Sequence, residues 1–376
     1  MMNKRVLHII THDVPWPADF GGVIDLFYKI KALHHAGVQV HLHAFVHRRP
    51  PQNELNKYCA SVNYYPRKKI TGISLRTPYI VSSRKNTALL RRLQQDNYPI
   101  LAEGIHSSYW LQAGRLQNRI VLLRLYNAEF EYYHKLALHE TNKLKQLYFS
   151  FESRLLKKYE QQLAQKVKIA ALSSNDVLLY QRQLHAKDIF HLPVFIPYTD
   201  AMGSEGCGCY CLYHGNLSVN ENEAVAIWLL QEVFSKLPVP FVIAGKNPSA
   251  KLEALVHQYE RSCLVANPSD KELHDLIVKA QVNVLPSFNN TGVKLKLLNA
   301  LFNGRHCLVN KAGVTGSGLD TICTIIDDNA AAFITAISYL YTIPYTDQMN
   351  EQRNSVLKNL YNNKKNTDKL IEIFWS

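Results

Sequence analysis

Residues 289–310 read NNTGVKLKLLNALFNGRHCLVN, a short helical pattern enclosed by Gly292 and Gly304 and followed by an apolar strand pattern. The expected helix carries Lys294 and Lys296 in its first turn, where two cations oppose the helix dipole. An anion held between them removes this conflict, and helix N-termini are ready-made sites for phosphate. The stretch therefore predicts a phosphate site within a strand–helix–strand unit.

The length of the chain indicates two domains. It has 376 residues, more than the roughly 250–300 at which a single hydrophobic core stops growing. Strand and helix patterns alternate from VLHII (6–10) to a turn-rich segment at 191–208, and the alternation restarts beyond it. Such alternation produces parallel sheets with helices on both faces. We expect an α/β protein with two Rossmann-like, doubly wound domains at 1–195 and 196–345, followed by a polar helix at 346–376.

Positive charge is concentrated in the first half of the chain. Residues 1–200 hold 28 Lys and Arg against 14 Asp and Glu, a net of +14, whereas residues 201–376 hold 15 against 16, a net of −1. This asymmetry is typical of a protein that meets a nucleic acid, an anionic membrane or an acidic substrate, and equally of a solubilising surface. No zinc-finger spacing or RNA-binding signature occurs, so we expect no nucleic acid partner.

A long basic segment, 131–168, carries one apolar stripe at helical spacing. The stripe consists of Leu144, Leu147, Tyr148, Phe151, Leu155, Tyr159 and Leu163. It is compatible with a helix that lies on a membrane, but we expect it to pack against the core of its own domain. No apolar run reaches the roughly 18 residues that a spanning helix needs. We predict a cytoplasmic protein, at most peripheral to the inner membrane surface.

The seven cysteines include three in CGCYC (207–211), and the others are isolated. No second cluster of Cys or His follows at a metal-ligand spacing, so we interpret these residues as structural thiols and predict no metal site. An odd number of cysteines without regular spacing is typical of a reducing compartment.

Three further loops offer groups that suit a phosphate. Gly21 and Gly22 close the loop after the first strand and open a helix, so a ligand can approach the backbone N–H groups there. In the second domain, YHGNLSVNEN (213–222) and IAGKNP (243–248) each end a strand, the latter with Lys246. Lysines on two strand-end loops indicate a diphosphate. The chain contains neither a G-x-G-x-x-G dinucleotide motif after a strand nor a Walker phosphate loop.

Together these stretches resemble the GT-B fold of retaining glycosyltransferases, in the large family that includes many bacterial mannosyl- and glucosyltransferases. The resemblance covers nearly the whole chain and is most specific in PWPADFGG, YHGNLSVNEN, FVIAGKNP, VNVLPSFNNTGVKLKLLNALFNGRHCLVN and GSGLD. It implies an N-terminal acceptor domain, a C-terminal sugar-nucleotide domain and a terminal helix that crosses back to the first domain. It also implies no cofactor, with UDP-sugar or GDP-sugar as donor substrate.

The resemblance assigns roles to individual residues. Gly22 would lie against the donor diphosphate, Lys246 and Lys294 would pair with its oxygens, and His106 would face the donor sugar. We therefore predict His106, Lys246 and Lys294 as catalytic. The predicted donor-binding residues are Gly21, Gly22, Gly215, Asn216, Lys246, Thr291, Gly292, Lys294 and Asn299.

Three positions depart from the family pattern. The paired glutamates of the family correspond to Thr291 and Asn299, and the arginine common after the HG glycine corresponds to Asn216. An asparagine still donates and accepts hydrogen bonds, but without the charge that strengthens them. The departures predict weaker or rearranged donor binding.

The stretch RLYNAEFEYY (124–133) resembles an Arg-x-His-Asn-x-Glu motif in which Tyr126 takes the place of the histidine. We predict that Arg124 and Glu129 either bind the acceptor or pair with each other.

The leading hypothesis is a retaining glycosyltransferase that moves a hexose from a nucleoside diphosphate sugar to a hydroxyl of a glycan or lipid-linked acceptor. The basic first half suits an anionic or lipid-diphosphate-linked acceptor at the membrane. Two alternatives are a sugar-nucleotide-binding partner of another transferase, without turnover, and a GT-B-fold nucleotide-sugar epimerase.

Overall fold

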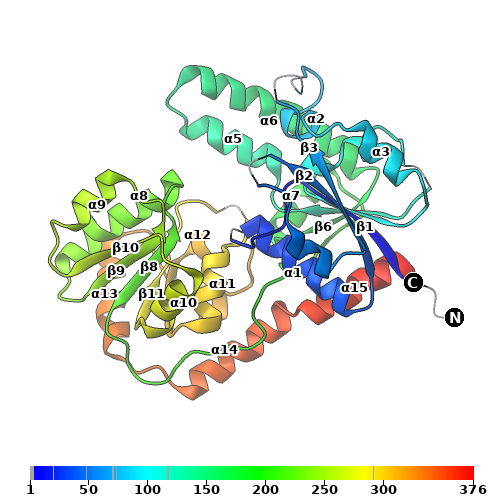
Figure 1. Ribbon diagram of the computed structural model, residues 1–376. Helices are drawn as coiled ribbons and strands as arrows, with labels where there is room; N and C mark the ends of the chain where they lie inside the picture. Colours follow the sequence, from blue (N-terminus) through cyan, green and yellow to red (C-terminus); the bar gives the residue numbers. More distant parts are fainter. Residues whose placement is uncertain are drawn as a thin grey trace. The chain divides into compact units, whose positions relative to one another are not determined.

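The computed structural model describes residues 4–19, 21–47, 49–69, 72, 74–116, 118–290 and 292–376. The chain divides into two compact units, each built around a parallel sheet (Figure 1). Unit 1 consists of Met1–Pro197 with Tyr361–Ser376, and unit 2 of Tyr198–Leu360. The predicted α/β class with two doubly wound sheets is confirmed.

Within the described residues, the sheet of unit 1 has seven strands in the order β3-β2-β1-β4-β5-β6-β7. The strands are β1 (Val6–Thr11), β2 (Gln39–Val46), β3 (Ser61–Pro66), β4 (Ile100–Glu103), β5 (Val121–Leu125), β6 (Lys168–Ala171) and β7 (Ile189–His191). The strand order reverses at the β1–β4 pair, where His8 is in register with Ile100. In open α/β sheets ligands bind beyond the carboxyl ends of the strands at such a reversal.

Helices cover both faces of this sheet. They are α1 (Gly21–His35), α2 (Tyr79–Ser82), α3 (Thr87–Leu93), α4 (Tyr109–Gln112), α5 (Glu129–His139), α6 (Lys143–Ala164), α7 (Ser174–Leu184) and α15 (Asn363–Trp375), with short 3₁₀ turns at Asn53–Lys57 and Ile105–Ser107. Apolar residues of α1 and α15 pack with alternate strand residues into one core. Residues of α2, α3, α4, α6 and α7 form the core on the other face.

The basic segment 131–168 forms two helices, α5 and α6, instead of one. Helix α5 ends at His139, and the side chain of Asn142 caps the start of α6. The prediction that its whole apolar stripe packs in the core is wrong. The second half of α6 is buried through Leu156, Tyr159 and Leu163, whereas residues 143–151 include no buried residue.

The end of the chain also differs from the single polar helix that we predicted. Two helices are present, α14 (Asp347–Leu360) and α15, and Asn362 caps the second by accepting a hydrogen bond from the backbone N–H of Lys365. Leu370 and Phe374 of α15 join the core of unit 1, and in Figure 1 the red α15 lies beside the blue α1. By contrast, α14 belongs to unit 2.

In the described part of unit 2, the sheet has six strands in the order β10-β9-β8-β11-β12-β13, which reverses at the β8–β11 pair. The strands are β8 (Cys211–Asn216), β9 (Phe241–Lys246), β10 (Ser262–Ala266), β11 (Val282–Val284), β12 (His306–Asn310) and β13 (Thr324–Ile326). The α-helices are α8 (Asn220–Trp228), α9 (Ala250–Val256), α10 (Asp270–Lys279), α11 (Leu295–Asn303), α12 (Lys311–Val314), α13 (Ala330–Thr342) and α14. The helix predicted at 220–235 continues from α8 through a π-helical turn (Leu229–Val233) and a 3₁₀ turn (Phe234–Lys236).

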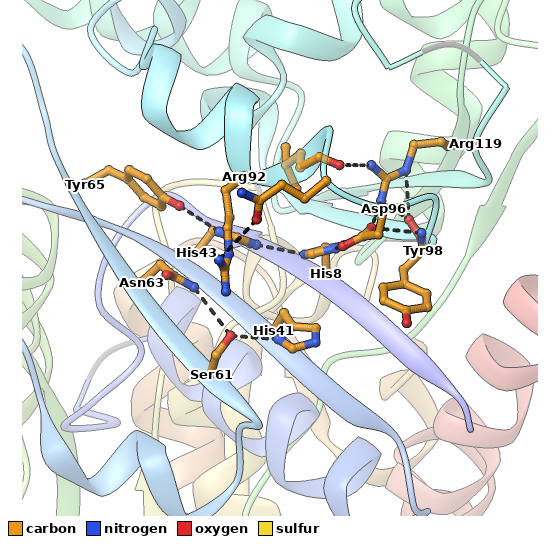
Figure 2. Close-up of polar contacts among 12 residues, drawn as sticks. His8, His41, His43, Ser61, Asn63, Tyr65, Arg92, Asp96, Tyr98 and Arg119 are labelled. Carbon is orange, nitrogen blue, oxygen red and sulfur yellow. Dashed lines mark hydrogen bonds and ion pairs between the residues drawn. The ribbon is translucent and has the colours of Figure 1, made fainter.

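A chain of hydrogen bonds crosses one face of the unit 1 sheet (Figure 2). Nδ1 of His8 lies 2.9 Å from Nε2 of His43, whose Nδ1 lies 3.0 Å from the hydroxyl of Tyr65. Nε2 of His8 lies 3.0 Å from a carboxylate oxygen of Asp96. Burial lowers the pKa of His8 and lowers that of His43 to about 3, so His43 is neutral in the folded protein at neutral pH.

We expect this row of hydrogen-bonded histidines to make the stability of unit 1 sensitive to mild acid. The unfolded histidines titrate near 6.5, so below that pH the unfolded state binds more protons than the folded state, and stability falls as the pH falls. For His43, whose pKa is lowered to about 3, the loss between neutral pH and pH ~5.5 is about 1.3 kcal/mol, and His8 adds to it in the same direction. Denaturant unfolding of the wild type and His43→Asn at both pH values measures the difference. Equal pH dependence in the two proteins would contradict a neutral, buried His43.

Candidate functional site

The strand reversal of unit 1 brings two histidines together beside the start of α1. His12 follows β1, and His106 lies in the 3₁₀ turn after β4. Their rings stack at 5.1 Å between centroids, and the ring of Tyr126, after β5, meets His12 edge-on at 5.5 Å. A Cβ on Gly22 would lie 3.9 Å from the imidazole of His12 and 4.0 Å from the ring of Tyr126. The predicted residues Gly22 and His106 therefore share one site, to which the structure adds His12.

Both histidines are neutral groups with open hydrogen-bonding capacity. Burial lowers the pKa of His12 to about 3, and the positive charge of Arg84 adds to the shift. Burial also lowers the pKa of His106, again with a contribution from Arg84. Among the described residues, Nδ1 of His12 and Nδ1 of His106 have no hydrogen-bond partner. Buried polar atoms are nearly always paired, so these two nitrogens are suited to a ligand hydroxyl or a water molecule.

A buried ionic network fixes α1 against the strands that carry this site. The ammonium group of Lys29 donates to Asp25 and to Glu103, each at 2.7 Å. The guanidinium of Arg124 donates to Asp25 at 3.2 Å, and the hydroxyl of Tyr126 donates to Glu103 at 2.7 Å. Burial alone would raise the pKa of Asp25, but the cations of Arg124 and Lys29 hold it below its usual range. The network links α1, β4 and β5, and so positions Gly22 beside His12.

The partners of Arg124 and Glu129 differ from those that we predicted from the sequence. Arg124 is fully buried and its ion-pair partner is Asp25, so the predicted pairing with Glu129 is wrong and a direct acceptor contact by Arg124 is not supported. Glu129 starts α5. Burial and the charge of Asp176 raise the pKa of Glu129 to about 7, against the opposing charge of Arg84. An acceptor contact by Glu129 stays a prediction.

We expect Gly22→Val to weaken ligand binding at least about tenfold without unfolding unit 1. Nothing in the backbone conformation or the packing demands glycine there, because a Cβ would meet its neighbours only at ordinary contact distances. Valine does, however, cover the exposed N-terminus of α1, where a phosphate would approach the backbone N–H groups. Calorimetric titration with a sugar nucleotide measures the affinity, and thermal unfolding without ligand is the control. Unchanged affinity would mean that the loop is only a turn.

The strand reversal of unit 2 carries the second group of predicted residues. Gly215 and Asn216 end β8, in register with Gly245 and Lys246 at the end of β9. The side chain of Asn216 is engaged locally, accepting hydrogen bonds from the backbone and the hydroxyl of Ser218. Lys246 is exposed and takes part in none of the ion pairs found among the described residues of unit 2. Its ammonium group is therefore available at the carboxyl edge of the sheet.

The two lysines of the opening stretch have different surroundings. Lys294 immediately precedes α11, as its N-cap residue. Lys296 points inward, where its ammonium group donates to the hydroxyl of Tyr213 and to the side-chain oxygen of Asn222, both at 3.2 Å. Burial lowers the pKa of Lys296 to about 8, and the charge of Lys294 contributes. Lys294 thus precedes the helix instead of lying in its first turn, and Lys296 alone is in that turn; the anion between them stays a prediction.

The remaining predicted donor residues lie around the same helix. Gly292 has a φ of 64°, a conformation that favours glycine. Thr291 lies outside the described residues. Asn299 is on α11, and its side-chain oxygen accepts a hydrogen bond of 2.8 Å from the amide of Asn303.

Glu221 is a site residue that sequence reasoning missed. It lies in the first turn of α8, where its two carboxylate oxygens accept hydrogen bonds from Ser287 at 3.2 Å and from Asn289 at 3.3 Å. Its charge opposes the lowering of the Lys296 pKa. An acidic residue in the first turn of a helix is common for reasons of the helix dipole alone, so the pattern gave no signal of a site.

Within the described residues, no group of three or more His, Cys, Asp or Glu side chains has an arrangement suited to a metal ion. Cys207 and Cys209 are exposed free thiols, and Cys211 is a buried one. Among the same residues, no helix combines the length and the apolar character needed to cross a bilayer.

The sequence matches no family model. An uncharacterised 44.6 kDa protein from the cps region of Klebsiella pneumoniae is 26% identical over 336 residues, which cover 82% of this chain and 84% of that protein. A glycosyltransferase from Rickettsia africae has a TM-score of 0.69 at 12% identity, covering 99% of this chain and 98% of its own. HepE from Anabaena, solved with UDP and glucose, has a TM-score of 0.65 at 10% identity, covering 98% of each chain.

These structural neighbours share the GT-B architecture of glycosyltransferases, in which two Rossmann-like domains follow one another along the chain. The chain described here has the GT-B fold.

Proposed function

We propose that this protein is a retaining glycosyltransferase that moves a hexose from a UDP- or GDP-sugar to a hydroxyl of a glycan or lipid-linked acceptor. The observation that carries the proposal is the pair of lysines around the strand reversal of unit 2. Lys246 is exposed at the end of β9, and Lys294 immediately precedes α11. On a GT-B fold, cations at this edge of the sheet are suited to the diphosphate of a sugar nucleotide.

The lysines supply the charge that the leaving diphosphate needs. When the bond between the anomeric carbon and the phosphate oxygen breaks, negative charge develops on that oxygen, and preorganised cations stabilise it. We assign this role to Lys246, Lys294 and the N-terminus of α11, without a metal ion or cofactor. For retention we propose front-side attack, in which the acceptor oxygen bonds to the anomeric carbon on the departing face and its proton passes to the leaving phosphate.

In unit 1 we assign His106 and Gly22 to the donor. The neutral imidazole of His106 is suited to a hydrogen bond with a sugar hydroxyl, and the N–H groups at the start of α1 are suited to phosphate oxygens. His12 stacks on His106 and so positions its ring. The basic surface of unit 1 suits an anionic or lipid-diphosphate-linked acceptor at the inner membrane surface.

Thermal unfolding in the presence of UDP, GDP and their common hexose conjugates tests the proposal. A ligand present at 100 times its dissociation constant adds about 2.7 kcal/mol of apparent stability. We expect one nucleotide and its sugar conjugate to raise the unfolding temperature, and the others to leave it unchanged. If no nucleotide changes it, the proposed donor class is wrong.

The surroundings of the Asn299 side chain favour a second candidate function, in which the protein binds a sugar nucleotide as the partner of another transferase. Its amide oxygen is engaged by Asn303, and it lacks the charge of the family glutamate. Such a protein would bind the nucleotide but release no sugar. Slow hydrolysis of the bound donor would favour the transferase, and binding without any hydrolysis or transfer would favour the partner.

A further inference from the structure

The hairpin of α5 and α6 exposes large apolar side chains that the core of unit 1 leaves uncovered. Leu144 is 81% exposed, Leu147 69% and Leu138 64%, and Tyr148 and Phe151 are also exposed. The teal hairpin extends from the rest of unit 1 in Figure 1. Scattered single apolar residues are normal on a protein surface, but a contiguous group of large ones marks an interaction site. We call these five residues the hairpin surface.

Exposed lysines lie next to the hairpin surface, together with one carboxylate, Glu140, in the turn between the two helices. Lys143 and Lys145 are exposed on α6 itself, between and beside the exposed leucines. Tyr79 lies against the same helix, and the sequence just before it contains Lys68, Lys69 and Arg76 and no acidic residue from 67 to 79. The backbone N–H of Tyr79 donates a hydrogen bond of 2.8 Å to Glu152 of α6, and the guanidinium of Arg67 lies over the Tyr79 ring at 5.2 Å.

We propose that the hairpin surface docks on an anionic phospholipid membrane. Apolar side chains enter the boundary between headgroups and acyl chains, and the neighbouring cations meet the lipid phosphates. The positive charge beside the hairpin surface disfavours the binding of a second copy of this protein there. A two-fold interface would place the same basic surface opposite itself, so that like charges would face each other. This inference deepens the membrane contact of the proposed function by naming the residues that make it.

Sedimentation with lipid vesicles tests the proposal without donor or acceptor, so its failure leaves the transfer reaction untouched. We expect the protein to bind vesicles of phosphatidylethanolamine with phosphatidylglycerol, and to stay in solution with phosphatidylcholine alone. Because about 1 kcal/mol per cation corresponds to about fivefold in affinity, Lys143→Glu/Lys145→Glu should weaken binding at least about 25-fold. Leu144→Ser/Leu147→Ser should weaken it at least about tenfold, by loss of buried apolar area.

Two control variants change exposed cations and an exposed apolar side chain of unit 2. Lys251→Glu/Lys271→Glu reverses two exposed lysines of α9 and α10, and Tyr339→Ser removes an exposed aromatic ring of α13. We expect both to bind vesicles like the wild type. Equal binding to both kinds of vesicle, or hairpin variants that bind like the wild type, would overturn the proposal. So would a wild-type dimer in analytical ultracentrifugation that Leu144→Ser/Leu147→Ser dissociates.

Discussion

Replacing both Lys246 and Lys294 by alanine is expected to lower turnover of the sugar nucleotide by at least about 10³-fold, and each single change by about 10²-fold. The two side chains flank the β8–β11 reversal, and in the proposed reaction they hold the charge that develops on the leaving diphosphate. Their loss leaves that charge without a cation. Steady-state release of the nucleoside diphosphate measures the effect.

The control for this experiment is Lys251→Ala, which removes an exposed lysine of α9 five residues after Lys246. We expect the turnover of this variant to match the wild type, because Lys251 is not at a strand end. Calorimetric titration of the double variant should also show weaker nucleotide binding. Wild-type turnover in the double variant would remove both lysines from the site.

Asp25→Ala is expected to lower the free energy of unfolding by about 3–5 kcal/mol, the cost of leaving a buried charge without its partner. Lys29, Arg124 and Asp25 are all fully buried, and Asp25 accepts hydrogen bonds from both cations. Denaturant unfolding measures the loss. Because the network holds α1, we also expect weaker nucleotide binding in this variant under conditions where it remains folded.

The exposed pair of Lys57 and Glu54 provides a matched control. Their charged groups lie 2.6 Å apart, as close as those of Lys29 and Asp25, but the Lys57 side chain is 66% exposed. Solvent screens such pairs, so Glu54→Ala should change stability by less than about 1 kcal/mol. Equal losses in the two variants would show that the buried network does not hold unit 1 together.

The fold followed from patterns that depend on local sequence alone. Alternation of strand and helix periods predicted both parallel sheets, because a crossover helix returns each strand in the same direction. Helix ends were harder to predict. The break at Asn362 depends on one side chain that caps α15, and the polar sequence on both sides gave no sign of it. The exposure of Leu144 and Leu147 also escaped prediction, because a helical apolar stripe has the same spacing whether or not a core covers it.

The positions of the candidate residues were predictable where they depend on loops that follow strands. Gly22, Lys246 and Lys294 each lie at the end of a strand or the start of a helix, which the pattern located. Arg124 was misinterpreted because its partner, Asp25, is distant in sequence and lies on a helix whose buried face holds charged residues. His12 was missed for a related reason, since only the tertiary fold stacks its ring on His106.

Release of UDP or GDP from a panel of hexose nucleotides, with and without glycan and lipid-diphosphate-linked acceptors, tests the central claim most directly. We expect the wild-type protein to release one nucleoside diphosphate, faster with a suitable acceptor, and the sugar to appear on the acceptor with its anomeric configuration kept. Lys246→Ala/Lys294→Ala should release almost none. No release from any sugar nucleotide, or equal release by this double variant, would contradict a glycosyltransferase that works through these lysines.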